Sequence, residues 1–103
     1  DGAAAYTLQA LWTQARENLN VINVVFANHS YLVLNFELAR VGAGEPGPAA
    51  QQMLSLDNPK MDWVKISEGF GVPARSVRTA GEFDDALVNA LKAGGPQTIV
   101  AEI

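Results

Sequence analysis

The stretch VINVVFA, residues 21–27, constrains the fold of this chain more than any other feature. It is short, rich in β-branched residues and apolar with little alternation, which is typical of a strand buried on both faces, as in a parallel sheet. TIVAEI at 98–103 has the same character, and RSVR at 75–78 predicts a shorter strand. Because helical patterns separate these runs, the sequence predicts an α/β fold: a three-layer, mostly parallel sheet flanked by helices.

The helical segments are predicted from periodicity and from end signals. Residues 4–19 carry apolar side chains at helical spacing, and residues 31–40 read as a short helix. A third helix is expected to start at Asn58-Pro59 and to end at a Gly71 cap. A fourth follows the TAGE sequence at 79–82, where a Thr and a Glu three residues later form a capping box.

The segment VGAGEPGPAAQQ, residues 41–52, is expected to be the one long connection, since it holds three glycines and two prolines. Its Gly/Pro part, 42–48, is either a lid or a linker. Trp12 and Trp63 lie on apolar faces of their helices, so both are expected in the core.

Composition excludes several classes of protein. With 103 residues, the chain is long enough for one small domain. A net charge of −4 without a Lys/Arg cluster argues against a nucleic-acid partner. The absence of cysteine excludes disulfides, thiolate metal sites and a cysteine nucleophile. No apolar run has the length of a membrane span and no signal peptide is recognisable, so a cytoplasmic location with no membrane partner is expected.

The lengths of the first two elements place the two ends of this region together. Residues 4–19 would run roughly 24 Å as a helix, and residues 21–27 would return roughly 23 Å as a strand. Asn28 is therefore expected at the level of Asp1. If a strand precedes Asp1, both residues lie at the carboxyl ends of parallel strands, where α/β sheets bind ligands.

The residues at this edge carry oxygen donors. Asp1 offers a carboxylate, Asn28 an amide oxygen and the loop 29–31 its carbonyls, which are the hard ligands that Mg²⁺ or Ca²⁺ prefers. Gly2-Ala3-Ala4-Ala5 would open a helix with small residues and leave N–H groups open to a phosphate. Together these residues predict a metal-bridged diphosphate site. The plainer alternative is a frayed terminus beside an ordinary turn.

Asp1-Gly2, a spacer of 25 residues and then Asn28 resemble the fingerprint of thiamine-diphosphate enzymes, which reads Gly-Asp-Gly, a similar spacer and Asn-Asn. The stretches WVKISEGFGVP and GGPQTIVAEI are also similar to the C-terminal, diphosphate-binding domain of the acetolactate synthase and benzoylformate decarboxylase group. The resemblance covers essentially residues 1–103 and implies the thiamine-diphosphate-binding fold. It implies a partial C-terminal domain of a longer chain, in agreement with termini that look cut.

The resemblance also implies a role for particular residues. Mg²⁺ would be bound by the side chains of Asp1 and Asn28 and by the backbone carbonyl of Ser30. The thiamine diphosphate would lie against a second set, and the substrate cavity would be bordered by a third. The cofactor-binding set is Gly2, Ala3, Ala4 and Tyr31, and the substrate-pocket set is Leu32, Val33 and Leu34.

The chain also departs from the family pattern. Ala27 replaces the first Asn of the Asn-Asn pair, and Leu32 stands where relatives often have Gly. The glutamate that activates the cofactor belongs to a separate N-terminal domain, so the resemblance places no catalytic residue in 1–103. Family sites form between subunits, which implies the remaining domains of the same enzyme and a homo-oligomer, dimer or tetramer, as partners. This piece alone is expected to be inactive.

The sequence thus favours an acetolactate synthase-like enzyme that decarboxylates and ligates small 2-oxo acids, with benzoylformate decarboxylase-like activity as a close second. A non-catalytic α/β binding module and a degenerate paralogue stay open, the latter because of Ala27 and Leu32. His29 is expected to be solvated or hydrogen-bonded rather than catalytic, and Glu37 to face solvent.

Overall fold

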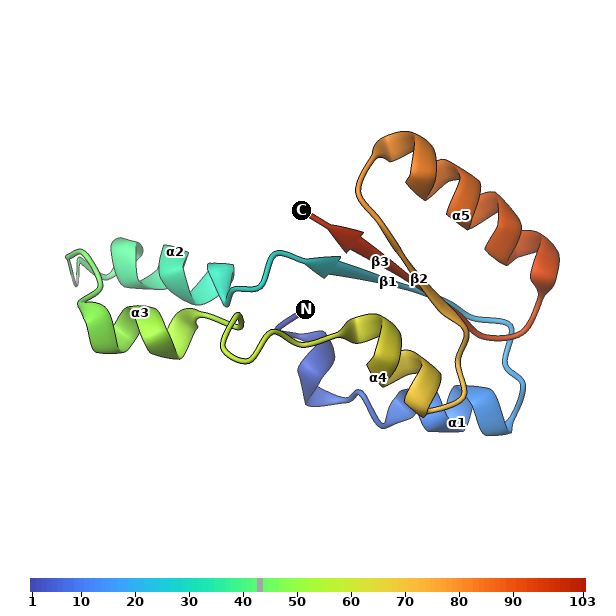
Figure 1. Cartoon of the computed structure of the whole chain (residues 1–103). Coiled ribbons are helices and arrows are strands. Elements are labelled where there is room, and N and C mark those ends of the chain that lie inside the picture. The colour runs from blue at the N-terminus through green and yellow to red at the C-terminus, as the bar shows by residue number, and fades with distance from the viewer. Residues whose placement is uncertain (43) are drawn as a thin grey trace.

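Three parallel strands form the centre of the molecule. The structure is a computed structural model that describes residues 1–42 and 44–103. Strands β1 (Ile22–Ala27), β2 (Ala74–Val77) and β3 (Gln97–Glu102) pair in the order β1-β3-β2, all parallel (Figure 1). The predicted strands at 21–27, 75–78 and 98–103 are confirmed to within one residue at each end.

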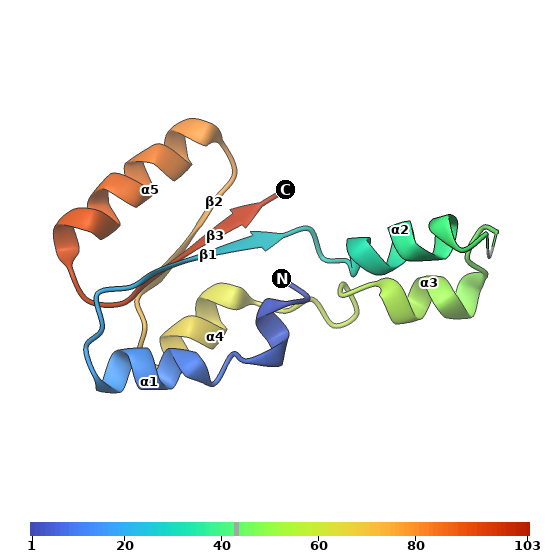
Figure 2. The ribbon, with the colours of Figure 1, turned by 180° about the vertical axis from the view of Figure 1, so that it is seen from behind.

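Helices cover both faces of this sheet. Helix α5 (Ala80–Ala93) lies on one face, and α1 (Ala10–Arg16) and α4 (Trp63–Gly69) lie on the other, as the two opposite views show (Figures 1 and 2). The predicted three-layer α/β fold is confirmed. The capping box at the start of α5 is also confirmed: Glu82 N–H donates to Thr79 Oγ1 (3.2 Å), and Thr79 N–H donates to a Glu82 carboxylate oxygen (3.1 Å).

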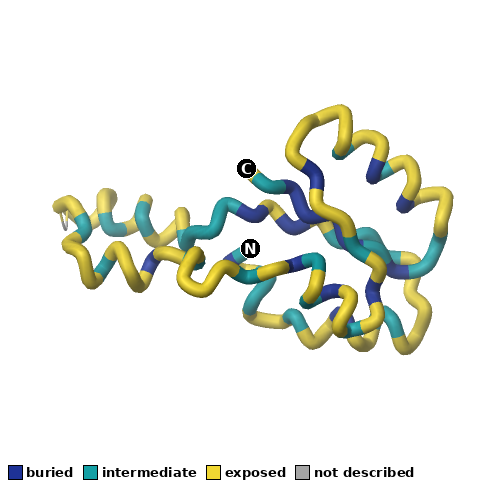
Figure 3. Tube along the Cα trace, in the orientation of Figure 1, coloured by how far each residue is buried: buried dark blue, intermediate teal, exposed yellow. Residues whose placement is uncertain are grey.

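The core consists of two apolar clusters, one on each face of β3. Residues that alternate along β3 supply both clusters, because successive side chains of a strand point to opposite faces. The cluster under α5 comprises Val77, Ala86, Ala90, Ile99 and Ala101. The cluster under α1 and α4 comprises Val25, Ala27, Trp63 and Val100. Trp63 is 2% exposed, as expected for a core residue, and the burial is concentrated around the sheet (Figure 3).

Two further helices form an arm that extends past the carboxyl edge of the sheet. Helix α2 (Leu32–Arg40) confirms the predicted helix at 31–40, and α3 (Pro48–Leu54) packs beside it (Figures 1 and 2). The arm makes the molecule long, with extents of 47 × 29 × 22 Å. The prediction of one long connection over 41–52 was wrong, because Pro48 at the first helical position starts α3. Within 42–48, residue 43 lies outside the described residues, and the choice between lid and linker stays open.

The predicted continuous helix over 4–19 is also wrong. The chain forms a 3₁₀ turn, η1 (Ala4–Tyr6), bends at Thr7 and begins α1 only at Ala10. The bend lets Ala4, Ala5 and Leu8 pack on the Trp63 cluster together. It also turns Trp12 outward to 52% exposure, where Arg16 stacks on its ring 5.2 Å from the centroid. Helical spacing had placed Trp12 in the core because it assumed one straight axis.

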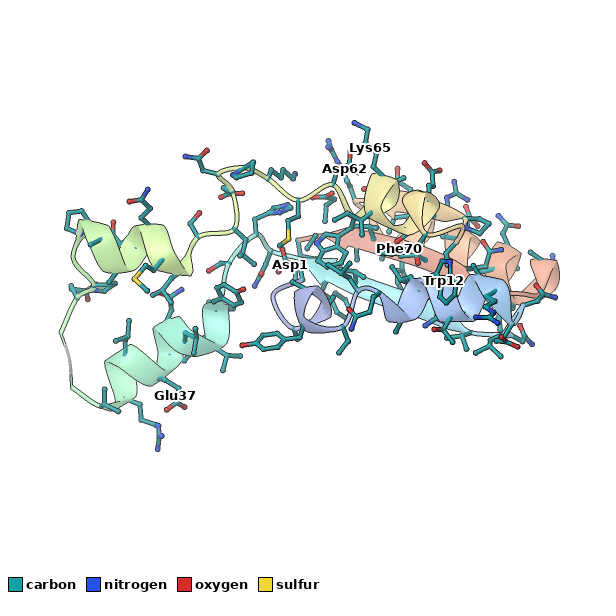
Figure 4. All side chains as sticks on the ribbon, turned by 90° about the horizontal axis from the view of Figure 1, so that it is seen from below. Asp1, Trp12, Glu37, Asp62, Lys65 and Phe70 are labelled. Carbon is teal, nitrogen blue, oxygen red and sulfur yellow. The ribbon has the colours of Figure 1, made fainter. Side chains whose placement is uncertain are left out.

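The third predicted helix begins later than expected. Helix α4 starts at Trp63, where the Asp62 side chain accepts a hydrogen bond from Lys65 N–H (3.0 Å), and Asn58-Pro59 belongs to the preceding turn. Both Asp62 and Lys65 are visible at this helix end in Figure 4. The predicted stop at Gly71 is confirmed by its φ of +87° and by its N–H, which donates to Glu68 O (2.9 Å).

Strand β1 is buried on one face only, which corrects the two-faced burial predicted for 21–27. Val25 and Ala27 are 9% and 1% exposed, whereas Val24 and Phe26 are 38% and 57% exposed. The cause is position: β1 is the edge strand beside β3, and α5 contacts β3 and β2. Among the described residues, no helix combines the length and apolar character needed to cross a membrane.

Candidate functional site

The candidate site lies where β1 and β3 end. Ala27, the last residue of β1, is in register with Glu102, the last residue of β3, so Asn28 emerges at the edge that Glu102 marks. Asp1 lies beside the same strand end, because its nitrogen donates to Phe26 O (2.7 Å). The structure therefore brings Asp1 and Asn28 to one level, as the element lengths predicted. Figure 4 shows Asp1 between the sheet and the arm.

The Asp1 carboxylate is enclosed by backbone. Its side chain is 1% exposed. One oxygen accepts from Gly2 N–H (2.9 Å) and the other from His29 N–H (2.8 Å). Hydrogen bonds of this kind stabilise the charged form of a carboxylate. They also tie the start of the chain to the loop after β1, 28 residues later.

The loop that follows β1 is held in place from both sides. Asn28 Oδ1 accepts from Ser30 N–H (3.2 Å). On the other side, Tyr31 N–H donates to Leu54 O (2.9 Å) and Leu56 N–H donates to His29 O (2.8 Å). The loop is thus pinned to the chain that leaves α3. These hydrogen bonds hold the Asn28 amide oxygen and the backbone of residues 29–31 in place.

Tyr31 lies against the first residues of the chain. A Cβ placed on Gly2 would stand 2.6 Å from Cδ1 of the Tyr31 ring. Ala3 precedes η1 and Ala4 is its first residue. Of the four residues assigned to cofactor binding, Gly2 and Tyr31 are therefore in contact, and Ala3 and Ala4 follow Gly2 in the chain. Because η1 is a single 3₁₀ turn, a phosphate here would meet individual N–H groups and not the dipole of the long helix that the sequence had suggested.

A hydrogen-bonded pair that sequence reasoning did not include, His29 and Glu102, lies behind the loop. His29 Nε2 is 2.9 Å from a Glu102 carboxylate oxygen, and Lys60 Nζ is 3.3 Å from the same oxygen. The hydrogen bond from His29, followed by that from Lys60, lowers the pKa of Glu102. The imidazole Nδ1 lies 3.7 Å from the Asp1 carboxylate. The expectation that His29 is hydrogen-bonded is confirmed. The one sequence signal that could have pointed to Glu102 is its position as a carboxylate at the end of the apolar strand at 98–103.

The residues assigned to the substrate pocket lie apart from this cluster. Leu32, Val33 and Leu34 form the first turn of α2 and are all exposed. Leu34 lines an apolar groove of about 360 Å³ between α2 and α3. Glu37 borders the same groove, is exposed, as expected, and pairs with Arg40 at 2.6 Å; Figure 4 labels it on α2.

The donor set at the strand ends fits Mg²⁺. Among the described residues, no three or more His, Cys, Asp or Glu side chains gather into a metal cluster. An ion at this edge would be held by the Asp1 carboxylate, the Asn28 amide oxygen and backbone carbonyls. This is the situation in which Mg²⁺ keeps waters and phosphate oxygens as its other ligands. The residues present are therefore compatible with a metal that bridges a diphosphate.

The chain is an α/β domain with a parallel sheet and oxygen donors at its carboxyl edge, the edge at which such domains bind ligands. Comparison with protein families identifies the family within this class. Residues 1–101 match the model described as "Thiamine pyrophosphate enzyme, C-terminal TPP binding domain". The chain belongs to this family of thiamine-diphosphate-binding domains, as the Asp-Gly and Asn28 spacing indicated.

Relatives and solved structures agree with this assignment. The chain is 54% identical over 100 residues, 96% of its length, to "Putative acetolactate synthase large subunit IlvX" of Mycobacterium tuberculosis, covering 19% of that protein. It is 32% identical over 96% of its length to benzoylformate decarboxylase of Pseudomonas aeruginosa, covering 17% of it. The structure superimposes on the thiamine diphosphate-dependent 4-hydroxybenzoylformate decarboxylase of Rhodococcus jostii RHA1 with a TM-score of 0.85 and 32% identity, over 97% of this chain and 18% of that one. The chain thus spans about a fifth of these proteins.

Proposed function

We propose that this chain anchors thiamine diphosphate through a bridging Mg²⁺ in an enzyme that acts on 2-oxo acids. The observation that carries the proposal is the hydrogen bond from His29 N–H to the Asp1 carboxylate (2.8 Å). It joins the two separated parts of the family fingerprint into one oxygen-rich edge. The family match supports the identity of the cofactor, and the chemistry of the donors supports Mg²⁺.

Three residues would hold the metal. Asp1 supplies the carboxylate, Asn28 supplies its amide oxygen and Ser30 supplies its backbone carbonyl. The hydrogen bond from His29 N–H supports this role, because it holds the Asp1 carboxylate beside the loop that carries Asn28 and Ser30. Ala27 does not alter the set, since it removes a side chain next to the ligand position and leaves Asn28 in place.

A second group would hold the diphosphate. Ala3 is exposed and Ala4 is half-buried, and both have small side chains, so phosphate oxygens could approach their backbone. Gly2 is buried and its N–H donates to the Asp1 carboxylate, so Gly2 would serve by holding this turn in place. Tyr31 closes the same place from the loop side and keeps Gly2 fixed by contact. When bound, thiamine diphosphate supplies the electron sink for decarboxylation of a 2-oxo acid, and this domain supplies binding and orientation.

For the reaction itself we favour an acetolactate synthase-like decarboxylation with carboligation, supported by the 54% identity to a protein of that name. The remaining domains of the same enzyme and a second subunit are proposed partners, and a small 2-oxo acid is the proposed substrate. Leu32, Val33 and Leu34 on the exposed start of α2 would border its cavity once those partners are in place. A benzoylformate decarboxylase-like activity is the second candidate, supported by the fold match at 32% identity.

Calorimetric titration of thiamine diphosphate into the complete parent protein, with and without Mg²⁺, tests the anchoring. We expect binding that requires Mg²⁺ and that is lost or strongly weakened in Asn28→Ala. Asn89→Ala is the matched control, because Asn89 is an exposed residue of α5 on the far layer. An unmodified parent that binds no thiamine diphosphate with Mg²⁺ would refute the proposal.

Product analysis separates the two reactions. With pyruvate as the substrate, an acetolactate synthase-like enzyme yields acetolactate. With benzoylformate, a decarboxylase yields benzaldehyde. Cofactor binding without either product would identify a degenerate paralogue, the reading that Ala27 and Leu32 keep open.

A further inference from the structure

We propose that Glu102 is a positioning residue for the metal-binding loop, which it holds through the imidazole of His29. This inference rests on the proposed function of Asp1 and Asn28 and adds a residue to it. Glu102 comes from the end of β3 and does not belong to the predicted ligand set. It would act on the metal through the His29–Glu102 pair, and not by touching the metal or the cofactor.

The first step is the geometry of the pair. His29 Nε2 and a Glu102 carboxylate oxygen are 2.9 Å apart, a hydrogen-bond distance between side chains 73 residues apart in sequence. The His29 side chain is 14% exposed, so water does not compete freely for this bond. With a proton on Nε2, the imidazole donates to the carboxylate, and this bond fixes the plane of the ring.

The second step is the backbone conformation of His29. Its φ is +53°, in the left-handed region that favours glycine and in which a side chain is strained. In this conformation its N–H points at the Asp1 carboxylate, 2.8 Å away. The hydrogen bond from the imidazole to Glu102 stabilises the left-handed conformation of His29, in which its N–H reaches the Asp1 carboxylate. Loss of the Glu102 carboxylate would therefore destabilise that conformation.

The third step is the rigidity of Glu102. It ends β3 in register with Ala27 of β1, so its backbone belongs to the sheet. Lys60 Nζ lies 3.3 Å from the carboxylate oxygen that His29 also contacts, and Ser76 Oγ lies 3.5 Å from the other oxygen. The carboxylate is therefore held from three directions. Through His29, it therefore fixes the position of the loop relative to the edge of the sheet.

The same contacts suggest a simpler role, in which the negative charge of Glu102 attracts Mg²⁺ from a distance. The two roles differ in what a glutamine would do. Glu102→Gln loses the charge but keeps an oxygen that accepts from His29 Nε2–H, whereas Glu102→Ala loses both. If Glu102 positions the loop, Glu102→Gln should keep most of the Mg²⁺ affinity that Glu102→Ala loses. If Glu102 attracts Mg²⁺ by its charge, both variants should lose affinity.

The experiment is calorimetric titration of Mg²⁺ into the complete parent protein with saturating thiamine diphosphate. Because removal of a residue that orients metal ligands typically weakens metal binding at least tenfold, Glu102→Ala should raise the Kd for Mg²⁺ by about tenfold. Glu102→Gln should retain most of the affinity. Glu37→Gln is the matched control, because it removes an exposed acidic charge from the arm. The thermal midpoint of the unliganded protein shows whether each variant is folded.

A double-mutant cycle tests the path through His29. His29→Gly removes the imidazole and supplies a residue that accepts a positive φ without strain. In that background, Glu102→Ala should have almost no further effect on Mg²⁺ affinity, since the pair is already broken. Fully additive effects would show that Glu102 does not act through His29 and would overturn the proposal.

The remaining outcomes are also decisive. Equal Mg²⁺ affinity of wild type and Glu102→Ala would overturn the positioning role and leave the proposed function intact. Equal losses in the alanine and glutamine variants, both folded, would assign the effect to charge alone. An unmodified parent that shows no Mg²⁺-dependent binding of thiamine diphosphate would overturn the proposed function, and this inference with it.

Discussion

Gly2 packs directly against the ring of Tyr31, although the two residues are far apart in sequence. A Cβ on Gly2 would lie 2.6 Å from Cδ1 and 2.7 Å from Cε1 of that ring, distances that real Cβ atoms do not show. The contact joins the turn before η1 to the loop after β1. Both segments belong to the proposed cofactor site, so the contact fixes their relative position.

Gly2→Ala is therefore expected to push the Tyr31 ring aside. Overpacking of this kind costs about 1–3 kcal/mol of stability, and the displaced ring should weaken Mg²⁺-dependent binding of thiamine diphosphate. Chemical denaturation and calorimetry of the parent protein measure the two effects. Gly81→Ala, at a position with open space in α5, is the control. A Gly2→Ala protein with wild-type stability and cofactor affinity would contradict the prediction.

Gly71→Ala should destabilise the protein, whereas Gly69→Ala should not. Gly71 has φ +87° just after α4, and a Cβ there would lie 3.3 Å from Cβ of Ala15 on α1. The left-handed backbone alone costs a non-glycine residue about 1–2 kcal/mol. Gly69 is the last residue of α4 and has open space, so alanine there should be neutral or stabilising by up to about 1 kcal/mol. Urea denaturation of both variants measures the difference in stability. Equal midpoints would show that the left-handed conformation of Gly71 does not contribute to stability as a cap of α4.

The two tryptophans should differ strongly when each is replaced by alanine. Trp63 is buried between α4 and the sheet, so Trp63→Ala should cost about 3–5 kcal/mol. Trp12 is exposed and stacked by Arg16, an interaction that contributes about 0.5–1 kcal/mol at such sites. Denaturant unfolding measures both. Comparable losses in the two variants would mean that Trp12 is covered in the complete protein.

The start of α5 should lose protection in acid. Hydrogen bonds from the backbone N–H groups of Arg78 and Thr79 lower the pKa of Glu82 from 4.5. A lowered carboxyl pKa adds stability that is present above the unfolded value and is lost as the pH falls through the folded value. Hydrogen exchange at the first turn of α5, corrected for intrinsic rates, should show protection that falls below about pH 4.5.

Glu82→Gln is the control for this pH dependence. It removes the titrating group, so its protection should be lower at neutral pH and should change little with pH in the same window. An unchanged pH dependence in Glu82→Gln would show that another group controls this helix end. Thr79→Ala removes the other half of the capping box and should cost about 1 kcal/mol at any pH.

Local sequence signals predicted those features in which neighbours along the chain decide the structure. The capping box of Thr79 and Glu82 involves residues three apart, and Gly71 ends its own helix, so both were predicted correctly. The level of Asn28 relative to Asp1 followed from the rise per residue of a helix and of a strand. The bend at Thr7 did not change that outcome, because η1 and α1 together still cover the sheet face.

Other features depended on contacts that no local pattern encodes. Periodicity placed Trp12 in the core, but the bend at Thr7 rotated it to the surface. Composition described 41–52 as a connection, yet Pro48 starts a helix because α2 provides a surface for it. Phe26 looked buried because β-branched runs usually are, but its exposure is decided by the edge position of β1 and the placement of α5.

By itself, the sequence determined the α/β class, the strands, the helix signals at Thr79 and Gly71, and the level of Asn28 relative to Asp1, because each depends on chain geometry or on residues close together. Only the tertiary structure decided that Tyr31 closes on Gly2 and that His29 meets Glu102, 73 residues away. Such contacts form when parallel strands bring their carboxyl ends to one edge. Their partners are chosen by register and packing, which are properties of the whole fold.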